Sequence, residues 1–507
     1  FQIEARVAGM HAPQIGDVGG PSVRYGEWFG AVGAQSNAGW RWTHDPRFAY
    51  CLVHYGKRRG ESEAEWKQIQ EAAAGVRNPF MSNRSRILSD WGGILEGGTD
   101  SDDFRFRSAA RVRVGRGVGH AHADGLDLGL WAMGLTMAGD CGARGGYGRP
   151  AADASLIHNV ATVDGANWQG HTWVPDLADF DGCRYLRAKG SYQKEFSRQV
   201  ALIEVDSGVP AATPPSRKDL AAGTVYDPKV VLPRTYFVDF FRLRGGRAHA
   251  YNFHGPTDDE FTINTPTGAV APATVARFGL GEFWKWYVVK DRQWEAGVPA
   301  GGLEATWRMS RQPQEFDCPG RGVYTVAPAE SSILGNAFDP ESPRKHLRVH
   351  IPGQVGQTVL SGVWISAPNT PGNRSGQIYR QLHLLRDNGG KEASSLFAAV
   401  WEPYAGAPFI KRVMRHGGAD DALAGAAVTV ETTDGVRDLT ACDLPDAPLR
   451  HLPGGVRAQG RFAFVSRDAQ GLRQAVLVGG TLLDTGDIAL ALPQSDWSAR
   501  VLEVDWL

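Results

Sequence analysis

Alternation of apolar and polar residues along the chain predicts a protein built mainly from β-strands. Short alternating or apolar runs recur from about residue 98 onward, for example at 184–196, 197–206, 234–246 and 358–366. Every second side chain of a strand points to the same face, so a half-buried strand is apolar at alternate positions. No repeat of propeller-blade length occurs, and the pattern therefore favours a large antiparallel β-sandwich of several sheets.

The segment 103–115 shows this alternation most clearly. Two phenylalanines and two valines would lie on one face of a strand, and four arginines would lie on the other. The arginine row allows two interpretations, either a solvated outer face or the lining of a groove that pairs with carboxylates. The four residues are Arg105, Arg107, Arg111 and Arg113.

Two segments ahead of the β-rich region have a helical composition. They span 46–59 and 61–77, and the second has a charged face. We therefore expect residues 1–95 to be helical and residues 96–388 to form the large β-sandwich. Residues 389–507 follow a polar, glycine-containing stretch near 385–395 and are expected to form a small β-sandwich.

Composition narrows the class of protein further. A length of 507 residues suits two or three domains, and 63 glycines with 29 prolines favour sheets and loops over helical bundles. The net charge of −1 provides no overall field for a polyanion, which argues against nucleic-acid binding. No apolar run is long enough to span a membrane. The five cysteines are far apart and odd in number, so no disulfide framework is predicted.

Histidines concentrate in one stretch of the chain. Residues 115–173 contain four of the 14, with His120 and His122 in an HxH pair and Asp140 following. In an extended strand the two side chains of such a pair point the same way. Imidazole and carboxylate ligands suit a borderline cation such as zinc, whereas a hydrogen-bonded histidine cluster would use the same residues. The spacing alone leaves both interpretations open.

Spaced motifs make the chain resemble the heparinase II/III-like polysaccharide lyases. The motifs are GHAHAD (119–124), AGDCG (138–142), GGYG (145–148), HN with VDG (158–159 and 163–165), and RTYFVDFFRLRGGRAHAYNFHGP (234–256). The resemblance implies a mainly β chain, with a large multi-sheet sandwich and a small sandwich preceded by the last helices of an (α/α) toroid. It also implies cleavage of a uronic-acid-containing acidic polysaccharide by β-elimination.

Elimination of this kind requires a base for the C5 proton, an acid for the leaving oxygen and a neutralised substrate carboxylate. By resemblance, His120 is the residue that acts as base or stabilises charge on the substrate. Tyr147, in the glycine-rich GGYG turn, matches a second catalytic residue. Arg144 and Arg149 flank this tyrosine, and we expect both, together with Trp168, to bind substrate.

The resemblance further implies a structural zinc site that includes His122 and Asp140. The third ligand is a histidine further along the chain. We expect His171, in WQGHTW, and keep His158, in the HN pair, as the alternative. Three protein ligands leave a fourth position for water, so geometry alone is also compatible with catalytic zinc.

The expected partner is an acidic polysaccharide or oligosaccharide, and the family expectation is a periplasmic or secreted location. Residues 1–95 contain no match for the catalytic residues of the toroid, so we expect either an inactive remnant or a toroid segment or chain outside this sequence. The oligomeric state is left open between a monomer and a homodimer. Two other functions use the same features: a non-catalytic carbohydrate-binding scaffold with structural zinc, and a cupin-like metal oxidoreductase based on His122, Asp140 and His171.

Overall fold

The computed structural model of the chain has mainly β structure, which confirms the predicted fold class. It describes residues 3–8, 36–56, 58, 60–98, 101–116, 122–140, 154–211, 226–276, 293–318, 322–326, 328–330, 341–353, 356–366, 377–417 and 425–502. Within these ranges, no helix is both long enough and apolar enough to cross a membrane.

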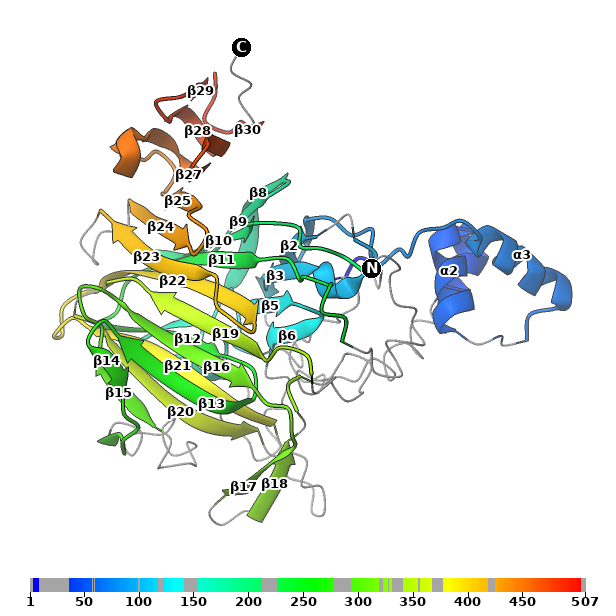
Figure 1. The fold of residues 1–507 in the computed structure, drawn as a ribbon, viewed down its shortest axis with the longest axis horizontal. Helices are drawn as coiled ribbons and strands as arrows, with labels where there is room; N and C mark the ends of the chain where they lie inside the picture. Colours follow the sequence, from blue (N-terminus) through cyan, green and yellow to red (C-terminus); the bar gives the residue numbers. More distant parts are fainter. Residues whose placement is uncertain are drawn as a thin grey trace.

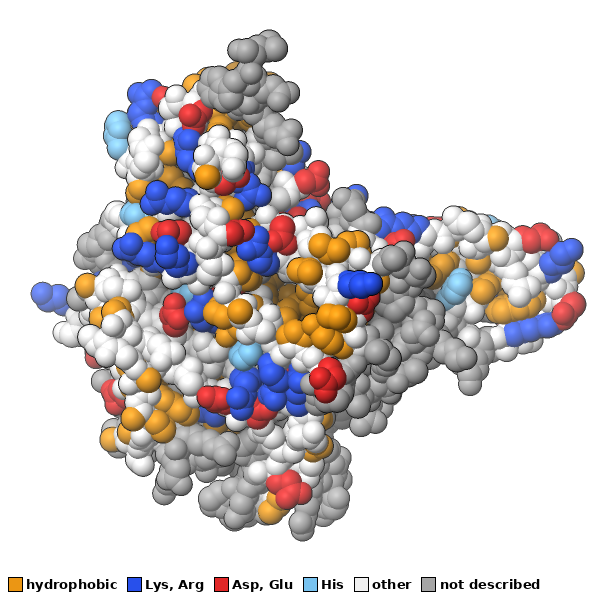
Figure 2. Space-filling model, in the orientation of Figure 1, with side chains coloured by type: hydrophobic (Ala, Val, Ile, Leu, Met, Phe, Trp, Pro, Cys, Tyr) orange, Lys and Arg blue, Asp and Glu red, His pale blue; other side chains and the backbone are white. Residues whose placement is uncertain are grey.

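Two helices, α2 (Pro46–Tyr55) and α3 (Glu63–Ala73), form a hairpin that projects to one side of the molecule (Figure 1). Their starts are set by side-chain caps: Asp45 accepts from the Arg47 amide, and Ser62 forms a capping box with Glu65. Apolar side chains from both helices pack between them. Both helices lie within the segments predicted to be helical. Figure 2 shows apolar side chains on the surface of this projection.

A ten-stranded antiparallel sheet is the largest element of the fold. In spatial order it contains β14 (Gly268–Val270), β13 (Asp258–Thr265), β16 (Leu303–Met309), β19 (Lys345–Ile351), β22 (Ser394–Ala405), β11 (Thr235–Arg244), β10 (Glu195–Glu204), β9 (Cys183–Gly190), β8 (His171–Phe180) and β4 (Gly115–Arg116).

Two five-stranded sheets pack on one face of the large sheet and share a continuous apolar core with it. This is the predicted multi-sheet sandwich. The first sheet contains β1 (Arg86–Leu88), β2 (Gly92–Gly97), β3 (Ser108–Val112), β5 (Leu128–Ala132) and β6 (Leu135–Ala138). The second contains β15 (Trp294–Gly297), β20 (Thr358–Ser366), β21 (Gln377–Asp387), β12 (Ala248–His254) and β7 (Ala161–Val163). A separate ribbon pairs β17 (Gln314–Cys318) with β18 (Gly322–Val326).

A C-terminal sheet covers part of the opposite face of the large sheet, as seen at the top of Figure 1. Tyr185 of β9 stacks on Phe462 across this contact, with 4.4 Å between the ring centroids. The sheet buries apolar side chains on both of its faces. Its strands are β23 (Ile410–His416), β24 (Ala426–Thr432), β25 (Arg437–Cys442), β26 (Arg450–His451), β27 (Arg457–Asp468), β28 (Gly471–Asp484), β29 (Ala489–Ala491) and β30 (Ser498–Leu502).

Two of the predicted domain boundaries differ from those in the structure. The first five-stranded sheet already begins at Arg86, before the predicted limit at residue 96. The stretch near 385–395, predicted as a linker, is the turn between β21 and β22. Because β22 pairs with β11 and β19 in the middle of the ten-stranded sheet, the chain enters the C-terminal sheet only at β23.

Three arginines of the segment 103–115 are buried, which corrects both interpretations of the arginine row. The segment is not one strand: Phe104–Phe106 is a 3-10 turn, Ser108–Val112 is β3, and Gly115 begins β4. Arg107 lies 3.5 Å from the buried carboxylate of Glu96, and Arg113 lies 2.8 Å from that of Asp124. A buried guanidinium needs such partners, which an alternation pattern does not reveal.

Candidate functional site

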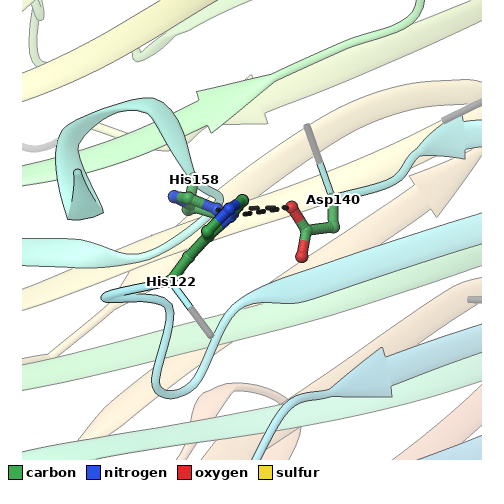
Figure 3. A group of neighbouring side chains, drawn as sticks. All are labelled: His122, Asp140 and His158. Carbon is green, nitrogen blue, oxygen red and sulfur yellow. Dashed lines mark hydrogen bonds and ion pairs between the residues drawn. The ribbon is translucent and has the colours of Figure 1, made fainter. Parts of the chain in front are cut away.

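Three buried side chains, His122, Asp140 and His158, converge between the sheets (Figure 3). Nδ1 of His122 lies 3.0 Å from Nε2 of His158. The nearer carboxylate oxygen of Asp140 lies 3.3 Å from the same His158 atom and 3.7 Å from Nδ1 of His122. One ligand atom from each residue therefore faces a common point, and these atoms all lie within 4.8 Å of one another.

Local structure fixes the orientation of His158. It caps a short 3-10 turn, Ser155–Ile157, and its Nδ1 lies 2.9 Å from the carbonyl oxygen of Ala154. A carbonyl can only accept, so the proton is on Nδ1 and Nε2 presents a lone pair to the group. A backbone contact of this kind is the usual way to set the tautomer of a metal-binding histidine.

Asn159, the residue after His158, holds this turn against two strands. The Asn159 amide donates to Asp127 at 2.7 Å, and its side chain donates to the Leu128 carbonyl at 2.7 Å. Its side-chain oxygen accepts from the backbone amide of His254 at 2.8 Å. The HN pair thus supplies one candidate ligand and the residue that anchors it to β5 and β12.

Burial and neighbouring charge set the ionisation of the carboxyl groups here. Burial alone would raise the pKa of Asp140, but the adjacent imidazoles of His122 and His158 hold that pKa well below its ordinary value. Burial raises the pKa of Asp124. Burial, followed by the charge of Asp140, raises the pKa of Asp127 to about 6. Asp140 is therefore the carboxylate most strongly held in its ionised form.

This donor set fits a zinc ion. Two imidazole nitrogens and one carboxylate oxygen are ligands that zinc commonly takes, and a site with three protein ligands leaves one position for a further donor. Nε2 of His158, whose other ring nitrogen contacts the Ala154 carbonyl, faces His122 and Asp140. Without a cation the same atoms form a hydrogen-bonded cluster in which His122 donates to His158, so the arrangement accommodates both states.

His171 lies outside this group, which corrects the expected third ligand. It begins β8, its side chain is 38% exposed, and its Nε2 lies 3.5 Å from the Asp90 carboxylate. The structure brings His122 and Asp140 together with His158, the alternative, instead. The set His122, Asp140 and His171, on which a cupin-like oxidoreductase would depend, does not assemble.

The other predicted site residues divide into two groups. His120, Arg144, Tyr147 and Arg149 lie outside the described residues. Trp168, expected to bind substrate, is only 4% exposed. Its indole packs on Gly125 so closely that a Cβ added there would lie 2.3 Å from the Trp168 ring. Trp168 is therefore a core residue and not part of a sugar-binding surface.

Sequence reasoning missed a buried arginine that joins the two histidine segments. Nη1 of Arg198, on β10, donates to the backbone carbonyls of Leu126 and Asn159, and the guanidinium pairs with Asp239 on β11. Leu126 follows His122 in the chain and Asn159 follows His158. The motif at 234–256 contains Asp239, but nothing in the sequence relates it to Arg198, which precedes that motif.

Comparisons with known proteins give a likeness of fold. No protein-family model matches the chain, and no curated protein matches its sequence. A heparinase III structure with methylated lysines is similar at 11% identity and a TM-score of 0.49, covering 87% of this chain and 50% of that one. Heparan sulfate lyase HepC from Pedobacter heparinus is similar at 10% identity and a TM-score of 0.48, covering 89% and 52%.

A further heparinase III structure is similar at 8% identity and a TM-score of 0.48, covering 87% of this chain and 53% of that one. The chain thus spans about half the length of each of these solved proteins. At these identities the likeness concerns the fold alone, and no residue role is transferred from it.

Proposed function

We propose that this chain is the β-sandwich portion of a polysaccharide lyase that cleaves a uronate-containing polysaccharide by β-elimination. The convergence of His122, Asp140 and His158 carries the proposal. It shows that three separate motifs, HAHAD, AGDCG and HN, meet in one buried group. His120 precedes His122 by two residues, and Tyr147 follows Asp140 by seven. Both proposed catalytic residues are thus close in sequence to members of this group.

In this proposal zinc is the ion that His122, Asp140 and His158 would hold. The bound ion would supply positive charge that fixes the two histidines and the carboxylate in place, and its role is structural. The chain itself already orients His158 through the Ala154 carbonyl and anchors the adjacent Asn159.

The chemistry then falls to the side chains near the substrate. His120 would take the C5 proton of the uronate, and Tyr147 would donate a proton to the leaving glycosidic oxygen. The C4–O bond breaks as the C4–C5 double bond forms, so the product carries an unsaturated uronate. Arg144 and Arg149 would neutralise the carboxylate, whose charge rises as the proton leaves. The toroid residues that complete the family's catalytic set would come from outside this sequence.

A screen of acidic polysaccharides with the complete gene product tests this function. We expect product that absorbs in the near ultraviolet, and we expect His120→Ala to lower kcat/KM by roughly 10²- to 10⁴-fold, the usual contribution of a general base. His451→Ala, an exposed histidine in the C-terminal sheet, is the matched control and should retain full activity. An unchanged rate for His120→Ala would remove that residue from the mechanism.

The same screen separates the rival functions. Binding of an acidic glycan without absorbing product would favour the carbohydrate-binding scaffold. Iron or copper in elemental analysis of the purified protein would favour a metal oxidoreductase, although its expected ligand His171 lies away from the group.

A further inference from the structure

An exposed tryptophan stands among polar side chains near the edge of the ten-stranded sheet. Trp173 of β8 is 37% exposed, in contrast to Trp168, which is buried. Lys189 of β9 lies directly opposite Trp173 in the strand register, and its ammonium lies 5.3 Å from the centroid of the indole. The ring of His171, two residues earlier on β8, is nearly parallel to the indole, at 19° and 5.8 Å.

These three side chains lie on the face of the sheet that points away from the His122–Asp140–His158 group. The neighbouring pair in register, Thr172 and Gly190, faces the core: Thr172 is fully buried, and a Cβ added at Gly190 would meet Thr172 and Phe196. Successive residues of a strand alternate between faces, so Trp173 and Lys189 point outward. The C-terminal sheet covers this face further along β8 and β9, where Arg461 pairs with Asp176, opposite Arg187, and Phe462 stacks on Tyr185.

The charge at this surface suits an acidic ligand. Among the residues that the structure describes, Lys189 forms no ion pair with a carboxylate, so its charge is balanced only by the indole. The nearby Asp176 is already shared by Arg187, at 3.4 Å, and Arg461, at 3.0 Å. The other carboxylate, Asp90, lies 3.5 Å from His171 and is 81% exposed, so it can accept hydrogen bonds from hydroxyl groups.

We propose that Trp173, Lys189 and His171 form an accessory platform for an acidic sugar residue of the polysaccharide. The indole would contact the apolar face of the sugar ring, and Lys189 would pair with its carboxylate or sulfate. Asp90 and His171 would bind hydroxyl groups and so fix the orientation. This inference rests on the proposed function, because the acidic glycan is the substrate of that function.

A platform on this face would act on long polymers. Holding one part of a chain there raises the local concentration of the remainder at the cleaving site, whereas a short oligosaccharide cannot reach both places. The platform therefore predicts a change in the KM for polymer with kcat for a tetrasaccharide unchanged. If Trp173 had a purely structural role, its replacement would not change the KM for polymer while leaving kcat for the tetrasaccharide unaltered.

The test is binding of the full-length protein to immobilised heparan sulfate, a sulfated uronate polymer, with neutral dextran as comparison. We expect Trp173→Ala and Lys189→Glu each to weaken binding to heparan sulfate by about tenfold, the size expected for loss of one aromatic or charged contact. Lys189→Arg should stay within about twofold, since it keeps the charge. Dextran should not bind.

Matched controls are Trp497→Ala, a tryptophan that is 51% exposed in the C-terminal region, and Lys67→Glu on α3. Wild-type affinity in Trp173→Ala, an equal loss in Trp497→Ala, or a wild-type chain that binds no heparan sulfate would each overturn the platform. The unsaturated product is measured separately. Binding that depends on Trp173, without product, would support the platform and contradict the lyase. Product together with unaltered binding in Trp173→Ala would support the lyase and contradict the platform.

Discussion

Replacing His158 by alanine is expected to abolish metal binding and to lower the stability of the sandwich, whereas replacing His171 should do neither. A ligand that binds only the folded state at a free concentration a thousandfold above its Kd adds about 4 kcal/mol to the free energy of unfolding. His158→Ala would lose this contribution, because its Nε2 faces the other two donors. His171 is half-exposed and away from them.

A chelator distinguishes the stability that the bound metal contributes from the stability that local packing of His158 contributes. Removing zinc from the wild-type chain should lower its melting temperature by roughly 10 °C, given about 2–4 °C per kcal/mol for a domain of this size. His158→Ala should melt at a lower temperature from the outset and show no further shift with chelator. His171→Ala should follow the wild type in both conditions. A chelator shift that persists in His158→Ala would contradict the assigned ligand set.

Replacing Arg198 by methionine is expected to cost about 3–5 kcal/mol of unfolding free energy, which is typical when one partner of a buried ion pair is removed. The change would leave the fully buried carboxylate of Asp239 without its cation. It would also free the carbonyls of Leu126 and Asn159, which Nη1 of Arg198 binds. Burial would favour a lower pKa for this guanidinium, but Asp239 raises it, so the arginine is charged in the folded chain.

Urea denaturation measures this effect, with Arg244→Met as the control. Arg244 lies at the end of the neighbouring strand β11, its side chain is 53% exposed, and it pairs with Glu392 at 3.4 Å. An exposed pair of this kind contributes at most about 1 kcal/mol. Replacing both members of the buried pair, as Arg198→Met with Asp239→Leu, should recover part of the loss, since no charge is then left unpaired. Equal losses for Arg198→Met and Arg244→Met would refute the role assigned to Arg198.

The sequence predicts the β-rich architecture and the helical hairpin well because both depend on local signals. Alternating apolar residues identify strands such as β10 and β11, and Ser62 with Glu65 forms the capping box that starts α3. Domain limits are harder to predict. The polar stretch near 385–395 has linker composition, yet it is a turn between two strands whose partners are distant in sequence.

Two of the three residues of the candidate metal group, His122 and Asp140, are predictable from motifs, whereas the third depends on tertiary structure. His158 and His171 both follow at plausible distances along the chain. Only the packing of the 3-10 turn against β12 and β5 brings His158 to the group, while β8 carries His171 to the edge of another sheet. Burial likewise distinguishes Trp168 from Trp173, which have similar sequence surroundings.

The most direct test of the account is the metal content of the purified wild-type chain, His158→Ala and His171→Ala, measured by elemental analysis. The account predicts one zinc ion per chain in the wild type and in His171→Ala, and none in His158→Ala. Absence of metal from the wild type, or loss of zinc in His171→Ala with retention in His158→Ala, would contradict it.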